Sequence, residues 1–274
     1  MKILISADME GITGITTWDQ VTPGHAEYLR FRHVMTADVN AAVRGAFEGG
    51  ADEVVIADGH WNASNILVEE LDPRARLNTG APSPFSMMQG IEEGVDGVIF
   101  VGYHARQGSR YAVLDHTWSD TCVSNVWLNE ALAGEYSLNG ALAGHYSVPV
   151  LMATGDQTAC AQIREQFGDL ETVVVKQGTG RYSAECLPPN ITQPMIEQCA
   201  KRSVQRLTKK DSLSPFRPEP PIKVTVELQG SDMADRASLL PGVHRDDRKL
   251  AFSAEDMPKA YSAFRALVLL SYPR

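Results

Sequence analysis

The sequence predicts an α/β fold, a three-layer α/β/α arrangement around a mainly parallel sheet, with a smaller C-terminal α+β subdomain. Short apolar runs alternate with amphipathic stretches, an order typical of parallel sheets covered by helices. Three of the apolar runs end abruptly in acidic or histidine residues: MKILISADMEGI at 1–12, DEVVIADGH at 52–60 and DGVIFVGYH at 96–104. These observations predict successive parallel strands whose carboxyl ends carry functional side chains.

The elements follow in order along the chain. Residues 1–7 are predicted as a strand, and apolar positions three and four residues apart between His25 and Glu48 predict one helix, stopped by Gly49–Gly50. The strand Glu53–Ala57 then completes a β-α-β unit, for which a right-handed parallel crossover is the default. Further helices are expected at 62–71, 85–91, 135–146 and 157–167, and further strands at 97–101, 126–128, 148–153 and 172–175.

Beyond Cys186 the pattern changes. A helix at 193–207, a proline-rich connector at 215–221 and an alternating strand at 223–228 predict an α+β subdomain. Ser253 with Asp256 resembles a capping box, which would open a final helix over 254–270. We therefore expect a metal-binding catalytic α/β domain at 1–186 and a C-terminal α+β subdomain at 187–274.

Composition narrows the possible partners. The net charge of −9 over 274 residues argues against nucleic acid and suits a divalent cation or a substrate with an amino group. No apolar stretch approaches the roughly 20 residues that span a bilayer, and the N-terminus lacks the pattern of a signal peptide. The cysteines show no C-x-x-C spacing and are expected to be free thiols, so we expect a cytoplasmic protein with no membrane partner.

The acidic and histidine residues that end the three apolar runs predict a metal site. Asp8 and Glu10 are two residues apart, so they leave an extended backbone on the same side, and two such carboxylates need a cation or a basic partner nearby. Ligands bind outside the carboxyl ends of strands in open α/β sheets, so His60 and His104 are expected to join them. Asp8 is the candidate to bridge two ions, which lie about 3.5–4 Å apart in two-metal sites.

Taken singly, these side chains are more commonly capping or hydrogen-bonded residues, but their coincidence at three consecutive strand ends favours a shared site. Two dications would need one more acidic ligand, and the residue pattern leaves five candidates open: Asp58, Asp115, Glu130, Glu135 and Asp156. His116, in the polar loop after the third strand, is equally consistent with a surface position. No catalytic role is expected for the remaining histidines, His25, His33, His145 and His244.

Several motifs, spread over essentially the whole chain, together resemble the zinc-dependent D-aminopeptidases of the DppA family. They are Ala7–Ile12 (ADMEGI), Asp58–His60 (DGH), Gly102–Ala105 (GYHA), Gly134–Glu135 with Leu138–Asn139, Val148–Met152 followed by Gly155–Asp156, and Val175–Gln177. Two places depart from the family pattern: Trp61 follows His60 where serine usually neighbours the ligand histidine, and residues 111–115 read YAVLD. Neither change removes a ligand, although both could alter the pocket wall.

The resemblance implies an enzyme that removes the N-terminal residue of short peptides, in particular D-amino-acid peptides such as D-Ala-D-Ala. It implies two zinc ions per subunit, and it resolves the choice of the last carboxylate in favour of Glu135. It also implies that His116 acts in catalysis and that the chain forms a ring-shaped homo-oligomer, a homodecamer, whose channel admits small peptides. The implied zinc ligands are Asp8, Glu10, His60, His104 and Glu135.

Two other classes remain as alternatives. A metal-dependent phosphoesterase would use similar ligands but needs cationic groups for phosphate, and only Arg106, Lys176 and Arg181 are available near the predicted site. A non-catalytic dipeptide-binding protein would hold its ligand without metal and without consuming it.

Overall fold

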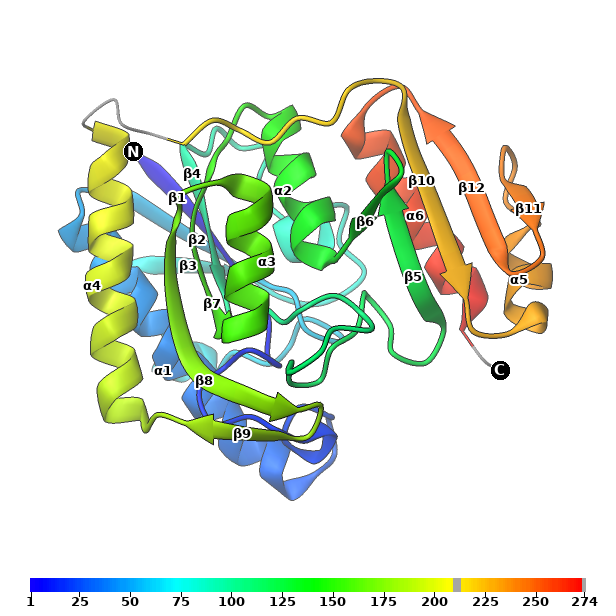
Figure 1. Cartoon of the computed structure of the whole chain (residues 1–274). Helices are drawn as coiled ribbons and strands as arrows, with labels where there is room; N and C mark the ends of the chain where they lie inside the picture. Colours follow the sequence, from blue (N-terminus) through cyan, green and yellow to red (C-terminus); the bar gives the residue numbers. More distant parts are fainter. Residues whose placement is uncertain (209–212, 273–274) are drawn as a thin grey trace.

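A seven-stranded sheet forms the centre of the computed structural model, which describes residues 1–208 and 213–272 (Figure 1). Its strand order is β3-β2-β1-β4-β7-β8-β9. Every neighbouring pair is parallel except β8 and β9, which are antiparallel, so the predicted α/β class with a mainly parallel sheet is confirmed. The strands are β1 (Lys2–Ala7), β2 (Glu53–Asp58), β3 (Ala75–Asn78), β4 (Gly97–Val101), β7 (Val150–Asp156), β8 (Glu171–Gly180) and β9 (Ser183–Cys186).

Helices cover both faces of this sheet (Figure 1). On the central strand β1, Ile3 and Ile5 belong to the apolar cluster that includes α1 (Ala26–Glu48) and α4 (Pro189–Thr208). Leu4, which points to the opposite face, packs in the cluster that includes α2 (Glu135–His145) and α3 (Gln157–Phe167). All three side chains are fully buried, as expected for a parallel strand enclosed by two helical layers.

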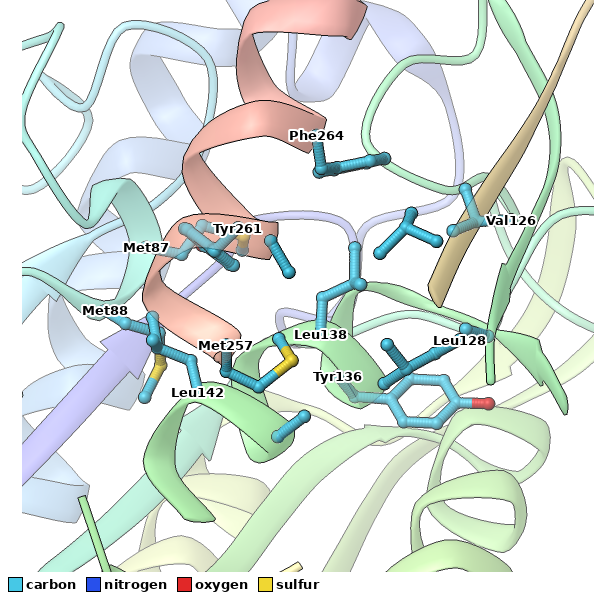
Figure 2. Packing of buried hydrophobic residues seen from close by; sticks show 14 of the residues in the cluster. Met87, Met88, Val126, Leu128, Tyr136, Leu138, Leu142, Met257, Tyr261 and Phe264 are labelled. Atoms are coloured by element: carbon cyan, nitrogen blue, oxygen red, sulfur yellow. The ribbon is translucent and has the colours of Figure 1, made fainter. Parts of the chain in front are cut away.

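A second, antiparallel sheet has the strand order β11-β12-β10-β5-β6. Helix α6 (Met257–Ser271) packs between this sheet and α2, and its Tyr261 and Phe264 lie in the core shared by the two parts (Figure 2). The remaining elements are β5 (Val123–Leu128), β6 (Ala131–Ala133), β10 (Ile222–Leu228), α5 (Ser231–Ala237), β11 (His244–Asp246) and β12 (Lys249–Ala254). The predicted smaller α+β subdomain is thus present.

The predicted domain boundary between residues 186 and 187 does not coincide with a division between the two sheets. Strands β5 and β6 come before that point and pair within the second sheet, whereas α4 comes after it and packs against α1. A Cβ added to Gly45 would lie 2.1 Å from the carbonyl oxygen of Glu197, so only glycine allows these two helices to come so close. The division into domains 1–186 and 187–274 stays a prediction about folding units.

Three local predictions were wrong. The segments 62–71 and 85–91 are not α-helices and contain only the 3-10 turns Val68–Glu70 and Ser86–Met88. Positive φ angles at Ala63 (57°) and Ser86 (47°) are incompatible with a right-handed helix at those residues. The final helix begins at Met257 and not at residue 254, because Ser253 lies in β12 and Asp256 alone caps α6, accepting from the Lys259 backbone N–H at 2.9 Å.

Two further findings concern membrane-spanning helices and disulfide bonds. None of the helices in the described residues has the length and apolar character needed to cross a bilayer. All four cysteines are free, as predicted.

Candidate metal centre

The candidate metal centre lies beside β1, where the order of the strands in the sheet changes direction. β1 is flanked by β2 on one side and β4 on the other, which is the kind of switch point at which open α/β sheets bind ligands. The residues just past the three strand ends include Asp8 after β1, His60 after β2 and His104 after β4. All three side chains are buried. The three strand ends therefore bring Asp8, His60 and His104 to the same edge of the sheet, as the sequence predicted.

Glycines allow these strand ends to pack closely. Gly11 donates its backbone N–H to the Gly102 carbonyl at 2.8 Å, and a Cβ on Gly11 would lie 2.0 Å from the Tyr103 carbonyl oxygen. Gly102 has φ +75°, a conformation that side chains rarely adopt, and a Cβ there would lie 2.2 Å from the Asp8 carbonyl oxygen. A larger residue at either position would push the Asp8–Glu10 segment away from β4.

Two groups of donor atoms meet at the carboxylate of Asp8. Its Oδ1 lies 3.3 Å from Nδ1 of His60, which is also 3.2 Å from Oε2 of Glu10. Its Oδ2 lies 3.3 Å from Nε2 of His104, which is also 3.1 Å from Oε1 of Glu135. The ligand atoms of Asp8, Glu10 and His60 lie close enough together to hold one ion, and those of His104, Glu135 and His116 lie close enough to hold another. Asp8 contacts both groups, because its Oδ2 also faces His104.

Backbone hydrogen bonds orient the imidazoles toward these carboxylates. Nε2 of His60 lies 2.7 Å from the Val21 carbonyl oxygen, and Nδ1 of His104 lies 3.0 Å from the Ala105 carbonyl oxygen. In the neutral imidazole, a ring N–H donated to a carbonyl leaves the other nitrogen as the one that can bind a metal ion. Such outer contacts are the usual means by which proteins orient metal-ligating histidines.

The carboxylates of the site favour the binding of positive charge. Burial alone would lower the pKa of His60, but the carboxylates of Glu10 and Asp8 outweigh it and hold this pKa well above its ordinary value. The same balance, with Glu135 and Asp8 as the carboxylates, raises the pKa of His104. Burial favours the protonated form of Asp8, yet the two histidines lower its pKa. A dication can replace the protons that these imidazoles would otherwise carry.

Unpartnered atoms support the same conclusion. Oδ2 of Asp8, Oε2 of Glu10 and Nε2 of His104 are buried without a hydrogen-bond partner among residues 1–208 and 213–272. Buried polar atoms of native proteins are nearly always satisfied, so each such exception needs an explanation. Carboxylate oxygens and imidazole nitrogens are ligands suited to borderline divalent ions, and the donor set therefore fits two of them.

Geometry separates the five acidic candidates. Glu135, in the first turn of α2, is the one whose carboxylate lies beside both His104 and His116. Asp58 accepts three hydrogen bonds from the turn that follows β2, and Asp115 accepts two backbone N–H groups of its own loop. Asp156 caps α3, while Glu130 is exposed and pairs with a lysine.

His116 lies directly beside this centre. Its ring stacks on His104 with centroids 3.9 Å apart and planes 9° from parallel, and its Nε2 is 3.6 Å from Oε1 of Glu135. Nδ1 of His116 is 2.8 Å from the Leu114 carbonyl oxygen, so Nε2 is the nitrogen that faces the site. The alternative of a plain surface histidine is excluded by its burial. The assignment of His116 to catalysis stays a prediction.

Comparison with known proteins agrees with this arrangement. A family model described as D-aminopeptidase matches residues 1–266. The chain belongs to the D-aminopeptidase family. It is 34% identical over 273 residues to a D-aminopeptidase of Bacillus subtilis (strain 168), an alignment that covers 99% of this chain and 98% of that protein. The chain is thus a peptide hydrolase of the metallo-aminopeptidase type.

A solved structure of the same family superimposes closely on this fold. It is described as the Zn-dependent D-aminopeptidase DppA from Bacillus subtilis, a self-compartmentalizing protease. The TM-score is 0.92 at 33% sequence identity, with 99% of this chain and 98% of that one covered. The resemblance identified from the sequence motifs is therefore confirmed.

In this member of the D-aminopeptidase family, tryptophans surround the candidate metal centre. A cavity of about 370 Å³ opens onto it, and three of the four tryptophans of the chain line this cavity. The Trp18 ring lies 5.5 Å from that of His116, and the Trp61 ring lies 6.4 Å from that of His60. The backbone N–H of Trp118 donates to Oε1 of Glu135 at 2.6 Å. The sequence pointed to Trp61 as a change in the pocket wall, but it did not reveal Trp18 and Trp118, because no local pattern places a loop tryptophan at a site.

Lys176 holds the loop that carries Glu10. Its Nζ is buried and donates to the carbonyl oxygens of Glu10 (2.5 Å), Ile12 (2.9 Å) and Ile15 (2.8 Å). Burial lowers the pKa of Lys176 to about 8. All three donors of the ammonium group are used by this loop, so none remains to bind a phosphate.

A buried hydrogen-bond network ties the ligand-bearing elements together. Tyr103, next to His104, shares a hydrogen bond of 2.6 Å with the Ser6 hydroxyl on β1. Asn139, one turn after Glu135 on α2, donates to the Tyr103 hydroxyl at 2.8 Å and accepts from the Tyr261 hydroxyl on α6 at 2.8 Å. Three elements that carry candidate ligands are thereby joined to the C-terminal helix.

Proposed function

We propose that this chain is a dinuclear zinc aminopeptidase that hydrolyses the N-terminal residue of short peptides, with a preference for D-amino-acid peptides such as D-Ala-D-Ala. The observation that carries the proposal is the Asp8 carboxylate, whose two oxygens face separate groups of nitrogen and oxygen donors. The Zn dependence described for the related structure favours zinc over other divalent ions.

Each ion would have its own ligands in addition to the shared Asp8. Glu10 and His60 would hold one, and His104 and Glu135 would hold the other. Zinc supplies Lewis-acid polarisation of a carbonyl and lowers the pKa of a coordinated water to about 7. This chemistry suits amide hydrolysis at neutral pH.

The remaining groups of the site would position the peptide and move protons. Nδ1 of His116 faces the Leu114 carbonyl, so its Nε2 would donate a hydrogen bond or a proton to the developing oxyanion or the leaving amine. Trp18 packs edge-on against His116 and would restrict its ring. The tryptophan walls of the cavity would exclude water from the scissile bond.

The phosphoesterase alternative is disfavoured by the charges around the cavity. Neither lysine nor arginine lines it among residues 1–208 and 213–272. Lys176 is fully engaged by backbone carbonyls, Arg181 lies 3.5 Å from the Asp115 carboxylate, and Arg106 lines a different cavity. A phosphate ester would therefore meet carboxylates and no cationic side chain of the described chain.

Assembly and location complete the proposal. A homodecameric ring whose channel admits only small peptides is supported by the self-compartmentalizing character described for the related structure. A cytoplasmic location is supported by the four free cysteines, because reduced thiols are typical of that compartment.

A comparison of four small substrates tests the proposal. Purified protein is dialysed against chelator, reloaded with zinc, and assayed with D-Ala-D-Ala, L-Ala-L-Ala, acetylated D-Ala-D-Ala and an aryl phosphate. We expect zinc-dependent release of alanine, fastest from D-Ala-D-Ala, and none from the acetylated peptide, which lacks a free amine. Cleavage of the aryl phosphate alone would favour the phosphoesterase, and metal-independent binding of dipeptide without hydrolysis would favour the binding protein.

A further inference from the structure

The position of the His116 ring depends on the loop that carries it. Within the described part of the chain the ring has one hydrogen bond, in which Nδ1 lies 2.8 Å from the Leu114 carbonyl oxygen. Its other contacts are the stack on His104 and the edge of Trp18, and a ring held by such contacts can still turn in its own plane. Nε2 is 3.6 Å from Oε1 of Glu135, which is longer than a hydrogen bond. The loop before His116 must therefore direct Nε2.

The hairpin turn between β8 and β9 supports Leu114. This residue has φ +49°, a left-handed conformation that is unusual for a bulky side chain and persists only where the surroundings impose it. Its backbone N–H donates to the carbonyl oxygen of Arg181, in the hairpin turn, at 2.9 Å. The preceding N–H, of Val113, donates to the Asp156 carboxylate at the end of β7 at 2.7 Å. The backbone before His116 is thus held by contacts from two other elements.

The Asp115 side chain closes the same loop from within. Its Oδ2 accepts from the backbone N–H groups of Gly108 (2.7 Å) and Ser109 (3.1 Å). Its Oδ1 lies 3.5 Å from Nε of Arg181, which is buried and has no hydrogen-bond partner in the described residues. Removing one member of such a pair leaves the other charge uncompensated. Because Asp115 directly precedes His116, a shift of its carboxylate moves the backbone that carries the His116 ring.

We propose that Asp115, paired with Arg181, is a positioning residue for His116. Neither Asp115 nor Arg181 lines the cavity, so neither meets the substrate. The pair acts by fixing the backbone from which Nε2 of His116 is directed at the reacting atoms. This inference rests on the proposed aminopeptidase function, to which it adds residues that determine turnover and not substrate binding.

The expected effect is on kcat. A positioned acid or base contributes about 10²–10⁴-fold to a rate, and a displacement of about 1 Å can cost about 10²-fold. Asp115→Ala should therefore lower kcat for D-Ala-D-Ala by about 10- to 100-fold, with KM and bound zinc unchanged. Asp115→Asn keeps an oxygen for the Gly108 and Ser109 N–H groups and loses only the charge, so it should lower kcat by less.

A double-mutant cycle separates positioning from general support of the fold. The kcat values of zinc-loaded wild type, Asp115→Ala, His116→Ala and the double variant are compared. Once His116 is absent, Asp115→Ala should change kcat by less than about twofold, because no ring remains to be positioned.

Asp72→Ala is the matched control. The Asp72 side chain is 10% exposed, against 7% for Asp115, and it also pairs with an arginine, Arg74. It accepts the Arg74 backbone N–H at 3.1 Å and does not line the cavity. This variant should leave kcat unchanged.

The crystal structure of the Asp115→Ala variant gives a second readout that does not depend on activity. The His116 ring should leave its stack on His104. An unmoved ring, a loss of bound zinc, or an equal decrease in kcat with and without His116 would each overturn the inference. If Asp115→Ala does not fold, the same cycle with Asp115→Asn decides. A zinc-loaded wild type that hydrolyses neither D-Ala-D-Ala nor L-Ala-L-Ala would overturn the proposed function instead, and the crystal structure would still test the positioning of His116.

Discussion

The Asn139–Tyr261 contact allows a quantitative test of how the C-terminal helix is coupled to the site. Tyr261→Phe removes the hydroxyl and leaves Oδ1 of Asn139 buried without its 2.8 Å donor. Asn139→Leu leaves the Tyr261 hydroxyl unpaired, while the Tyr103 hydroxyl keeps its contact with Ser6. A buried polar group left unsatisfied costs about 1–3 kcal/mol, so each single variant should lose about that much unfolding free energy.

The double variant should be less destabilised than the sum of the two single changes. With the amide and the hydroxyl both gone, neither partner is left unsatisfied, and replacing both partners of a hydrogen bond by apolar groups costs little. We expect a coupling energy of about 1–2 kcal/mol by urea denaturation at fixed zinc concentration. The control pairs Asn139→Leu with Tyr28→Phe. Tyr28 belongs to the other apolar cluster, and its hydroxyl donates to Asn65 and not to Asn139. Coupling no larger than in the control would refute the reasoning.

Three further predictions concern single residues. His116→Ala should lower turnover by about 10²–10⁴-fold with zinc content unchanged, and loss of zinc would make His116 a ligand instead. Lys176→Met should lower zinc affinity, because it frees the loop that carries Glu10. The control Lys201→Met removes an exposed ion pair and should leave the zinc affinity unchanged. Equal zinc affinities of the two variants would contradict the role of Lys176. Burial raises the pKa of Asp38 to about 6, so the folded state binds this proton more tightly than the unfolded chain, whose carboxyl titrates near pH 4. As pH rises from about 4 to about 6, Asp38→Asn should therefore gain stability relative to the wild type, and a pH-independent difference in unfolding free energy would contradict this.

Features encoded locally could be predicted from the sequence. The run Ile3–Ile5 followed by Asp8 and Glu10 specifies a buried strand and its polar end within a dozen residues, and α1 shows its period over 23 residues. A shared site could also be predicted for Asp8, Glu10, His60 and His104, because ligands of open α/β sheets bind outside the carboxyl ends of the strands. The choice of Glu135 came from family resemblance and not from the residue pattern.

Features that depend on distant partners could not be predicted. The helical periodicity at 62–71 is overridden where Asn65 bonds to the Asp58 carboxylate, and the edge strand β3 is short and not fully buried. Lys176 meets carbonyl groups more than 160 residues earlier in the chain, so no local signal shows its role. Strands β5 and β6 join a sheet whose other members lie about a hundred residues later, which is why the predicted boundary at residue 187 does not follow the sheets.

The central claim is that one carboxylate, Asp8, is shared by two zinc ions, and metal counting tests it most directly. Bound zinc per chain is measured by mass spectrometry of the metal in the wild type and in the folded variants Asp8→Ala, His60→Ala and His104→Ala. The account predicts two ions in the wild type, the weakening of one ion in each histidine variant, and the weakening of both in Asp8→Ala. A wild type that holds no zinc, or an Asp8→Ala variant that keeps two ions as tightly, would contradict it.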